Sequence, residues 1–240
     1  MNPAVVQWGA LALCAVGAVI RVPGLRKGQG RTVFAALVLL TAAVALSLSP
    51  IYEVVDAVLG GVNVANLVLR FVLYAVFVLL GVRMAAAFGS VLGKRLIIGR
   101  FGVAVLALTV LATLYFFIAS ELPTSSRSLY AYGDQDTVQQ YSAVGRLYPG
   151  YVSACLVLPA VASVLDARSR VIHRIACAFL ASGFGLVVVF VLLRLASINL
   201  RQWDIVLPFT AIVLTVVGLC LIRIGRTIIR RRERRANLLA

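Results

Sequence analysis

The fold is decided by one stretch of the sequence, Val62-Asn-Val-Ala-Asn-Leu-Val-Leu-Arg70-Phe-Val-Leu-Tyr74-Ala-Val-Phe-Val-Leu-Leu-Gly-Val82. Fourteen of its residues are Val, Leu or Phe, and Arg70 is its single charge. A helix needs about 20 mostly apolar residues to cross about 30 Å of hydrocarbon. The stretch is long enough, and it therefore predicts a membrane-spanning helix that carries one arginine inside.

The whole chain has the same character. Of its 240 residues, 62% are hydrophobic and 13% are charged, and its mean hydropathy is +1.03. A soluble chain has about 45–50% apolar and about 25% charged residues, so a soluble protein is excluded. The sequence predicts an all-α polytopic membrane protein with a basic tail at 224–240 and seven spans at about 2–20, 33–50, 62–82, 101–119, 144–165, 174–198 and 203–223.

The basic residues predict the orientation. The connections 21–32, 83–100 and 166–174 and the tail hold 18 of the 23 Lys and Arg residues. The positive-inside rule then predicts a protein of the cell membrane whose N-terminus is outside and whose C-terminus is in the cytoplasm.

Topology and lipid binding account for the net charge of +15, so nucleic acid is not expected as a partner. Each Lys or Arg near an anionic leaflet contributes about 1 kcal/mol of attraction. Anionic head groups at the cytoplasmic face are expected to contact Arg223, Arg226, Arg230, Arg231 and Arg232.

The chain lacks the residues that metal binding, cofactor binding and several kinds of catalysis require. The chain has a single histidine, His173, and two lysines, Lys27 and Lys94, all in connections between spans. It also lacks a phosphate-binding GxxxxGK[ST] loop, and its four cysteines lie within spans. We therefore expect no metal site, no cofactor, no catalytic residues and no enzymatic activity.

Polar residues within the spans form one stripe. Asn63, Asn66, Arg70 and Tyr74 are spaced by three, four and four residues, which puts them on one helix face. Such a face is expected to point into the bundle or a wet cavity. The other groups expected to converge on a substrate site there are Glu121, Tyr148, Tyr151 and Arg194.

Two interpretations of the stripe stay open. In the structural one, Arg70 pairs with an outer carboxylate and the asparagines bond between helices. In the functional one, an excess of guanidinium lines an outward pocket for an anionic or zwitterionic solute or a lipid head group. Arg146 and Arg201 lie near outer span ends, where we expect their side chains to reach the head groups.

Two wider patterns bear on the organisation. Residues 15–20 and 31–37 resemble residues 160–165 and 174–180, which predicts a parallel 3+1+3 pseudo-repeat of the kind found in small sugar carriers of the SWEET type. The polar segment 120–143 is either a solvated connector or a lid or docking surface.

A resemblance adds to these patterns. Ser49-Pro-Ile-Tyr-Glu-Val-Val-Asp56, Gly61-Val-Asn-Val-Ala-Asn-Leu67 and Tyr148-Pro-Gly-Tyr151 are similar to segments of a seven-helix membrane family of high-GC Gram-positive bacteria described as transporters. Arg168-Ser-Arg170 and the following helix with Arg174 and Gly183 resemble its second half. The resemblance implies an integral membrane protein involved in transport. Longer members of the family continue into a C-terminal cytosolic domain, which this sequence does not show.

Two functions are therefore expected. The first is a small-solute transporter or permease-like protein with an outward-facing polar pocket around Arg70. The alternative is a non-transporting sensor or accessory subunit that docks on a protein partner, or on a second copy of itself, through its helices or the 120–143 loop.

Overall fold

A computed structural model of the chain describes residues 3–25, 30–196, 198, 200 and 203–239. Within these ranges the regular structure is helical and no strand occurs, so the all-α prediction is confirmed. The helices are α1 (Pro3–Val19), α2 (Val22–Leu25), α3 (Arg31–Leu46), α4 (Ser49–Val58), α5 (Val64–Ala87), α6 (Val91–Ile98), α7 (Arg100–Ile118), η1 (Arg127–Tyr132), α8 (Asp136–Leu165), α9 (Val171–Leu195) and α10 (Trp203–Leu239).

Six helical segments of the described chain are long and apolar enough to cross a membrane: Ala4–Leu25, Val64–Ala87, Arg100–Ile118, Asp136–Leu165, Val171–Leu195 and Trp203–Gly225. The seventh expected span, 33–50, differs. The 16-residue helix α3 is about 24 Å long by helical rise and meets the criterion only together with α4, which is bent from it by 94°. The number of spans is therefore six, or up to seven if this bent pair is one span.

Pro50 explains the break between α3 and α4. It stands in the first turn of α4, where the fixed φ and missing N–H of proline are tolerated. Within a continuous helix the same proline would remove a hydrogen bond and clash with the preceding turn. Leu48 accordingly has an extended backbone, and a new helix begins after it.

Two other helices are longer than the expected spans. Helix α8 begins at Asp136, eight residues before the expected span 144–165, because Val138 and Tyr141 continue the buried face that contains Gly145 and Tyr148. Helix α10 continues beyond 223, so the backbone of the predicted tail is helical as far as Leu239.

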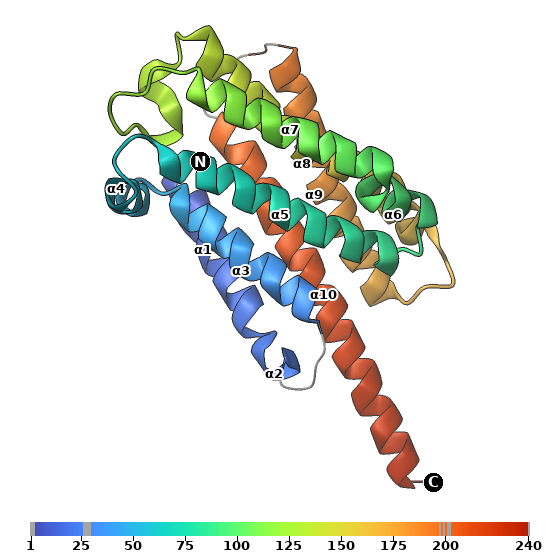
Figure 1. Ribbon diagram of the computed structural model, residues 1–240. Coiled ribbons are helices and arrows are strands. Elements are labelled where there is room, and N and C mark those ends of the chain that lie inside the picture. The colour runs from blue at the N-terminus through green and yellow to red at the C-terminus, as the bar shows by residue number, and fades with distance from the viewer. Residues whose placement is uncertain (1–2, 26–29, 197, 199, 201–202, 240) are drawn as a thin grey trace.

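Six helices form a closed ring. Going around it, α1 packs on α3, α3 on α5, α5 on α8, α8 on α9, α9 on α10, and α10 on α1 (Figure 1). Helix α7 lies outside the ring against α8. Helix α1 begins near the end that carries η1, and α10 extends beyond the opposite end (Figure 1). The consecutive triples α1–α3–α5 and α8–α9–α10 are each contiguous, while the pseudo-repeat itself stays a prediction.

Small residues bring the ring helices together. A Cβ added to Gly183 of α9 would lie 2.5 Å from Thr215 Oγ1 of α10, and one added to Gly218 would lie 2.9 Å from the carbonyl oxygen of Ala176. Glycine at such positions lets two backbones approach, as is common between membrane helices.

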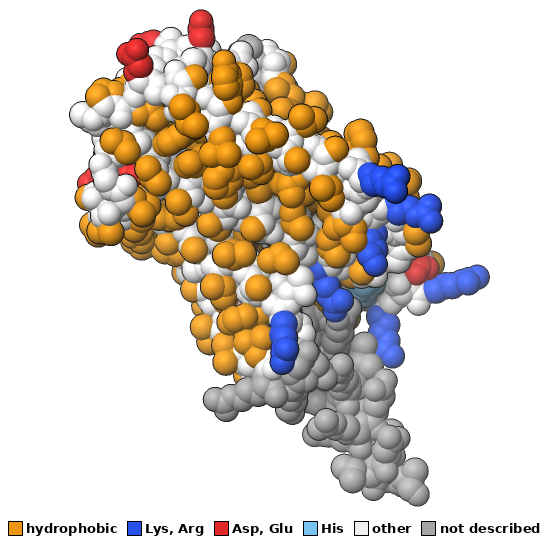
Figure 2. Space-filling view, in the orientation of Figure 1, with side chains coloured by type: hydrophobic (Ala, Val, Ile, Leu, Met, Phe, Trp, Pro, Cys, Tyr) orange, Lys and Arg blue, Asp and Glu red, His pale blue; other side chains and the backbone are white. Residues whose placement is uncertain are grey.

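The outer surface is apolar between two charged ends. On α7, Leu108, Leu111 and Ile118 are 67%, 63% and 80% exposed. Water-soluble monomers rarely expose a large contiguous patch of such apolar side chains. Figure 2 shows hydrophobic side chains across the middle of the molecule, acidic side chains mainly near the η1 end and basic ones toward the opposite end. This surface and the long apolar helices are those of a helical, multi-pass integral membrane protein.

Candidate functional site

A cavity of about 830 Å³ opens near the η1 end of the bundle. Four ring helices contribute charged side chains to it: Arg70 from α5, Arg146 from α8, Arg194 from α9 and Asp204 from α10. Three guanidinium groups thus share the cavity with one carboxylate of the described chain.

Arg70 is held by an aromatic ring and a glycine. Its Cζ lies 5.1 Å from the centroid of the Tyr141 ring, within cation–π distance. A Cβ on Gly145 would lie 2.6 Å from the same Cζ, so the guanidinium occupies the space that a larger residue at 145 would fill. The Nε atom of Arg70 is buried and makes no hydrogen bond.

The structural interpretation of the stripe required a carboxylate beside Arg70. Among the described residues, the ion pair found within 4.0 Å is Arg194 with Asp204, with 3.4 Å between Nε and Oδ1. Arg70 has no carboxylate partner in that part of the chain. The side chain of Arg70 is half-buried, and its buried Nε–H donor has no hydrogen-bond partner, which costs about 1–3 kcal/mol or more on a charged group. An anion that accepts a bond from this donor therefore gains free energy.

The other two arginines border the same space. Arg146 Cζ lies 5.9 Å from the centroid of the Phe190 ring. The side chains of Arg194 and Asp204 are 28% and 27% exposed, and a pair this exposed contributes little to stability. Arg194 can therefore leave Asp204 and bind a ligand that enters the cavity.

The two asparagines of the stripe form hydrogen bonds with neighbouring segments and do not line the cavity. Asn63 precedes α5 with a φ of 64°, and its Oδ1 accepts hydrogen bonds from the Tyr52 hydroxyl at 3.1 Å and from the Ser126 N–H at 2.6 Å. Its Nδ2 donates to the carbonyl of Thr124 at 2.7 Å. Asn63 therefore ties α4 and the segment before η1 to the start of α5.

Asn66 acts one turn further along. Its Oδ1 accepts a hydrogen bond from the Tyr141 hydroxyl at 2.9 Å, and both residues are buried. The bond fixes the ring that lies beside Arg70. Asn66 is thus a support of the cavity wall and does not line the cavity.

The predicted tyrosines lie deeper in the bundle. The Tyr74 hydroxyl is 2.8 Å from Thr113 Oγ1 on α7, and its ring meets that of Tyr148 edge-on at 5.9 Å. The Tyr148 hydroxyl is buried without a hydrogen bond, and Tyr151 donates to the carbonyl of Leu96 at 2.6 Å. None of the three lines the cavity.

Glu121 also lies outside the cavity. The residue is exposed, and its backbone N–H and carbonyl pair with the side-chain amide of Gln135 at 3.2 and 3.0 Å. Of the eight residues predicted for the site, Arg70 and Arg194 line the cavity, and Asn63 and Asn66 support its surroundings.

Sequence reasoning missed Arg146, Tyr141 and Gly145 as parts of the site. Arg146 was expected to reach the head groups, but it lies at the cavity wall. Tyr141 and Gly145 are four residues apart on the buried face of α8, and that spacing is the signal that a search of the sequence could have used.

Asp56, which lies just before the stripe in sequence, supports the start of α5 and does not line the cavity. Its buried carboxylate accepts the backbone N–H groups of Asn63 and Ala65, both at 3.0 Å, at the N-terminus of α5. A carboxylate there satisfies otherwise unbonded N–H groups and interacts favourably with the helix dipole.

The predicted lipid-binding arginines can be placed only in part. Arg223 lines a second cavity, at the opposite end of the bundle. The side chains of Arg226, Arg230, Arg231 and Arg232, and all of Arg201, lie outside the described residues.

No known protein family, curated protein or solved structure matches this chain. Within the part of the chain that the structure describes, no group of three or more His, Cys, Asp and Glu residues is arranged to hold a metal ion. The site is therefore defined by its own geometry, a membrane cavity with an excess of arginine.

Replacing Gly145 tests the placement of Arg70. Gly145→Ala puts a methyl group where the guanidinium lies, and because the methyl meets the far end of a flexible side chain, Arg70 must turn away from the Tyr141 ring. We expect the loss of that contact to cost about 0.5–1 kcal/mol in stability, seen as a lower unfolding temperature in detergent. Gly185→Ala on α9 is the control, because an added Cβ there meets nothing within 4 Å. Equal unfolding temperatures for the two variants would contradict the packing of Arg70 on Gly145.

Proposed function

We propose that the protein is a small-solute carrier that binds an anionic solute in the cavity lined by Arg70, Arg146 and Arg194. One observation carries the proposal: three guanidinium groups share this cavity with one carboxylate, and the Nε of Arg70 has no hydrogen-bond partner. The excess of positive charge favours an anion over a neutral or cationic solute.

The chemistry of arginine narrows the class of solute. A guanidinium group binds carboxylate or phosphate oxygens through two parallel N–H bonds, and it stays charged at any physiological pH. Such bonds are stronger inside an apolar bundle than in water, because the effective dielectric constant is lower. The volume of about 830 Å³ falls within the range of small-molecule sites, which supports a small organic anion.

Alternating exposure of the site would use the two helix triples. The cavity lies where α5 of the first triple meets α8, α9 and α10 of the second. Rocking of one triple against the other would open the cavity to the opposite side, as in carriers built from repeats. With the N-terminus outside, the cavity as described here opens outward.

The segment between α7 and α8 supports the alternative function of an accessory subunit or sensor. It is anchored by Asn63 through Thr124 and Ser126, and it exposes 65% of Tyr130. An anchored loop with an exposed aromatic ring suits a protein partner. A chain that purifies in mild detergent without a companion protein would count against this alternative.

Transport can be measured directly in proteoliposomes. We expect uptake of at least one of three labelled probes (succinate, glutamate or inorganic phosphate) by the wild-type chain, and at least a tenfold loss of that flux in Arg70→Gln. The matched control is Arg100→Gln, since Arg100 is exposed and does not line the cavity. Equal flux in the wild-type and Arg70→Gln proteins would contradict the assignment of the site, and no flux of any probe would favour the accessory role.

Cysteine labelling in whole cells tests the orientation. Asp134 and Arg168 are exposed in connections at opposite ends of α8, and each accepts a cysteine without disturbing buried packing. A membrane-impermeant maleimide is expected to label Asp134→Cys in intact cells and Arg168→Cys only after permeabilisation. The parent chain, whose four native cysteines are buried or half-buried, gives the background. The reverse pattern would contradict the N-outside orientation.

A further inference from the structure

A second cavity, of about 340 Å³, lies at the opposite end of the bundle from the Arg70 cavity. It too is lined by three arginines: Arg21, from the turn between α1 and α2, Arg83 of α5 and Arg223 of α10. The remaining walls include the apolar residues Val33, Met84, Ala87, Leu219 and Ile222. Segments from the start, the middle and the end of the chain thus bring three guanidinium groups together.

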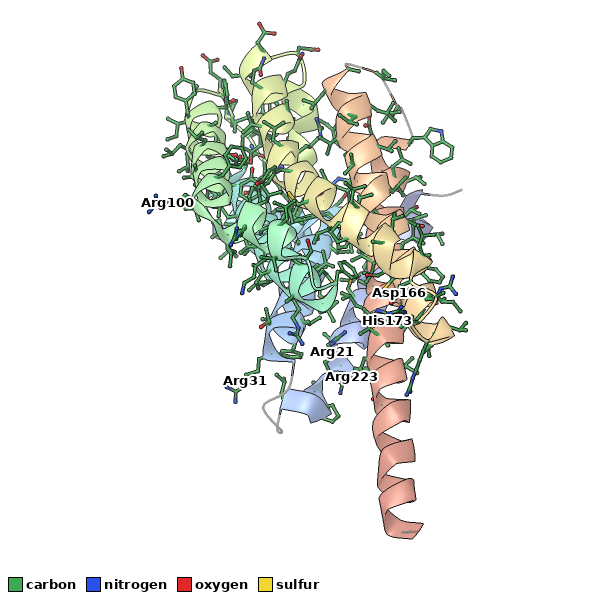
Figure 3. The ribbon with its side chains drawn as sticks, turned by 90° about the vertical axis from the view of Figure 1, so that its right-hand side faces the viewer. Arg21, Arg31, Arg100, Asp166, His173 and Arg223 are labelled. Atoms are coloured by element: carbon green, nitrogen blue, oxygen red, sulfur yellow. The ribbon has the colours of Figure 1, made fainter. Side chains whose placement is uncertain are left out.

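Arg21 is built into this site. Its side chain is only 8% exposed, and its Nη2 donates to the carbonyl of Leu219 on α10 at 2.9 Å. Leu219 is one helical turn before Arg223, so the bond places Arg21 beside that second arginine. Figure 3 shows Arg21 and Arg223 close to each other beside α10, whereas Arg31 and Arg100 point away from the bundle.

The cavity has no negative charge of its own in the described chain. None of the described residues that line it is Asp or Glu. Asp166, on the α8–α9 turn, does not line the cavity and accepts bonds from the Ser169 hydroxyl at 2.8 Å and the Arg168 N–H at 3.0 Å. These bonds hold the pKa of Asp166 below its ordinary value and keep it ionised at that turn.

Three like charges around one cavity repel one another, and the repulsion is stronger beside apolar walls than in bulk water. A bound anion offsets it. A phosphate group suits the site best, because its several oxygens can accept paired N–H bonds from more than one guanidinium at once. The apolar walls beside the arginines suit the glycerol and the first acyl carbons of a lipid.

We propose that the cavity formed by Arg21, Arg83 and Arg223 binds a phosphate group, carried either by an anionic phospholipid or by a soluble phosphorylated molecule. Its place at the end of the apolar band favours the lipid head group. The inference does not depend on the proposed transport function, since no residue lines both cavities.

Binding can be measured on the full chain in detergent. The probes are short-chain phosphatidylglycerol, short-chain phosphatidylcholine and inorganic phosphate, and the readout is the ligand-induced rise in unfolding temperature over a concentration series. We expect the wild-type chain to bind phosphatidylglycerol and the double variant Arg83→Gln, Arg223→Gln to bind it at least tenfold more weakly. The control, Arg31→Gln with Arg100→Gln, removes the same charge from exposed positions outside the cavity and keeps wild-type affinity.

The source of the phosphate follows from the same series. Stabilisation by phosphatidylglycerol but not by inorganic phosphate identifies the lipid, and stabilisation by both to a similar degree identifies a soluble phosphate. Equal affinity in the wild type and the double variant, equal loss in the control, or no binding of either phosphatidylglycerol or inorganic phosphate would overturn the proposal. So would binding of zwitterionic phosphatidylcholine as tight as that of anionic phosphatidylglycerol. If the double variant unfolds before it can be titrated, Arg223→Gln alone replaces it, with Arg100→Gln as its single-charge control.

Discussion

The guanidinium of Arg70 lies inside an apolar helix bundle, against the backbone of Gly145 and beside the ring of Tyr141. An arginine at the centre of a membrane helix costs about 2.5–3.5 kcal/mol of insertion free energy. Arg70 lies six residues from the start of α5 and is half-buried at the cavity wall, so its cost is lower, and no carboxylate of the described chain pairs with it. Gly145 leaves space for the guanidinium, and the ring of Tyr141 provides an aromatic face beside it. The glycine on α8, the bond from Tyr141 to Asn66 and the anchoring of α5 by Asp56 all serve to hold this one group at the cavity wall.

The same two helices connect both arginine cavities. Helix α5 carries Arg70 and, 13 residues further on, Arg83, while α10 carries Asp204 at one end and Arg223 toward the other. Each cavity is completed by helices that the other lacks: α8 and α9 at the η1 end, and the α1–α2 turn at the opposite end. Arginine side chains thus line a cavity at each end of the apolar band, where an anion would enter or a lipid head group would lie.

Hydrophobic pattern predicted most of the helices, because apolar runs of about 20 residues have few alternatives in a membrane. It missed the bend at Pro50, where a local backbone constraint interrupts an apolar run. It predicted that the stripe from Asn63 to Tyr74 shares a face, but not that its members have separate partners in α4, α7 and α8.

The site was harder to predict for a physical reason. Arg70 and Gly145 are distant in sequence, and their contact depends on how α5 packs on α8. Arg146 near a span end has the same sequence signature whether it reaches the head groups or lines a cavity. Only the packing of four helices distinguishes these cases.

The central claim is that Arg70, Arg146 and Arg194 form an anion site inside the bundle. Anomalous diffraction from crystals grown with selenate tests it most directly, because selenium marks the position of a bound oxyanion. The claim predicts a selenium peak in the cavity with oxygens about 2.7–3.2 Å from the guanidinium nitrogens of Arg70 and at least one of its two neighbours. An empty cavity with Arg70 paired to a carboxylate of the protein would contradict it.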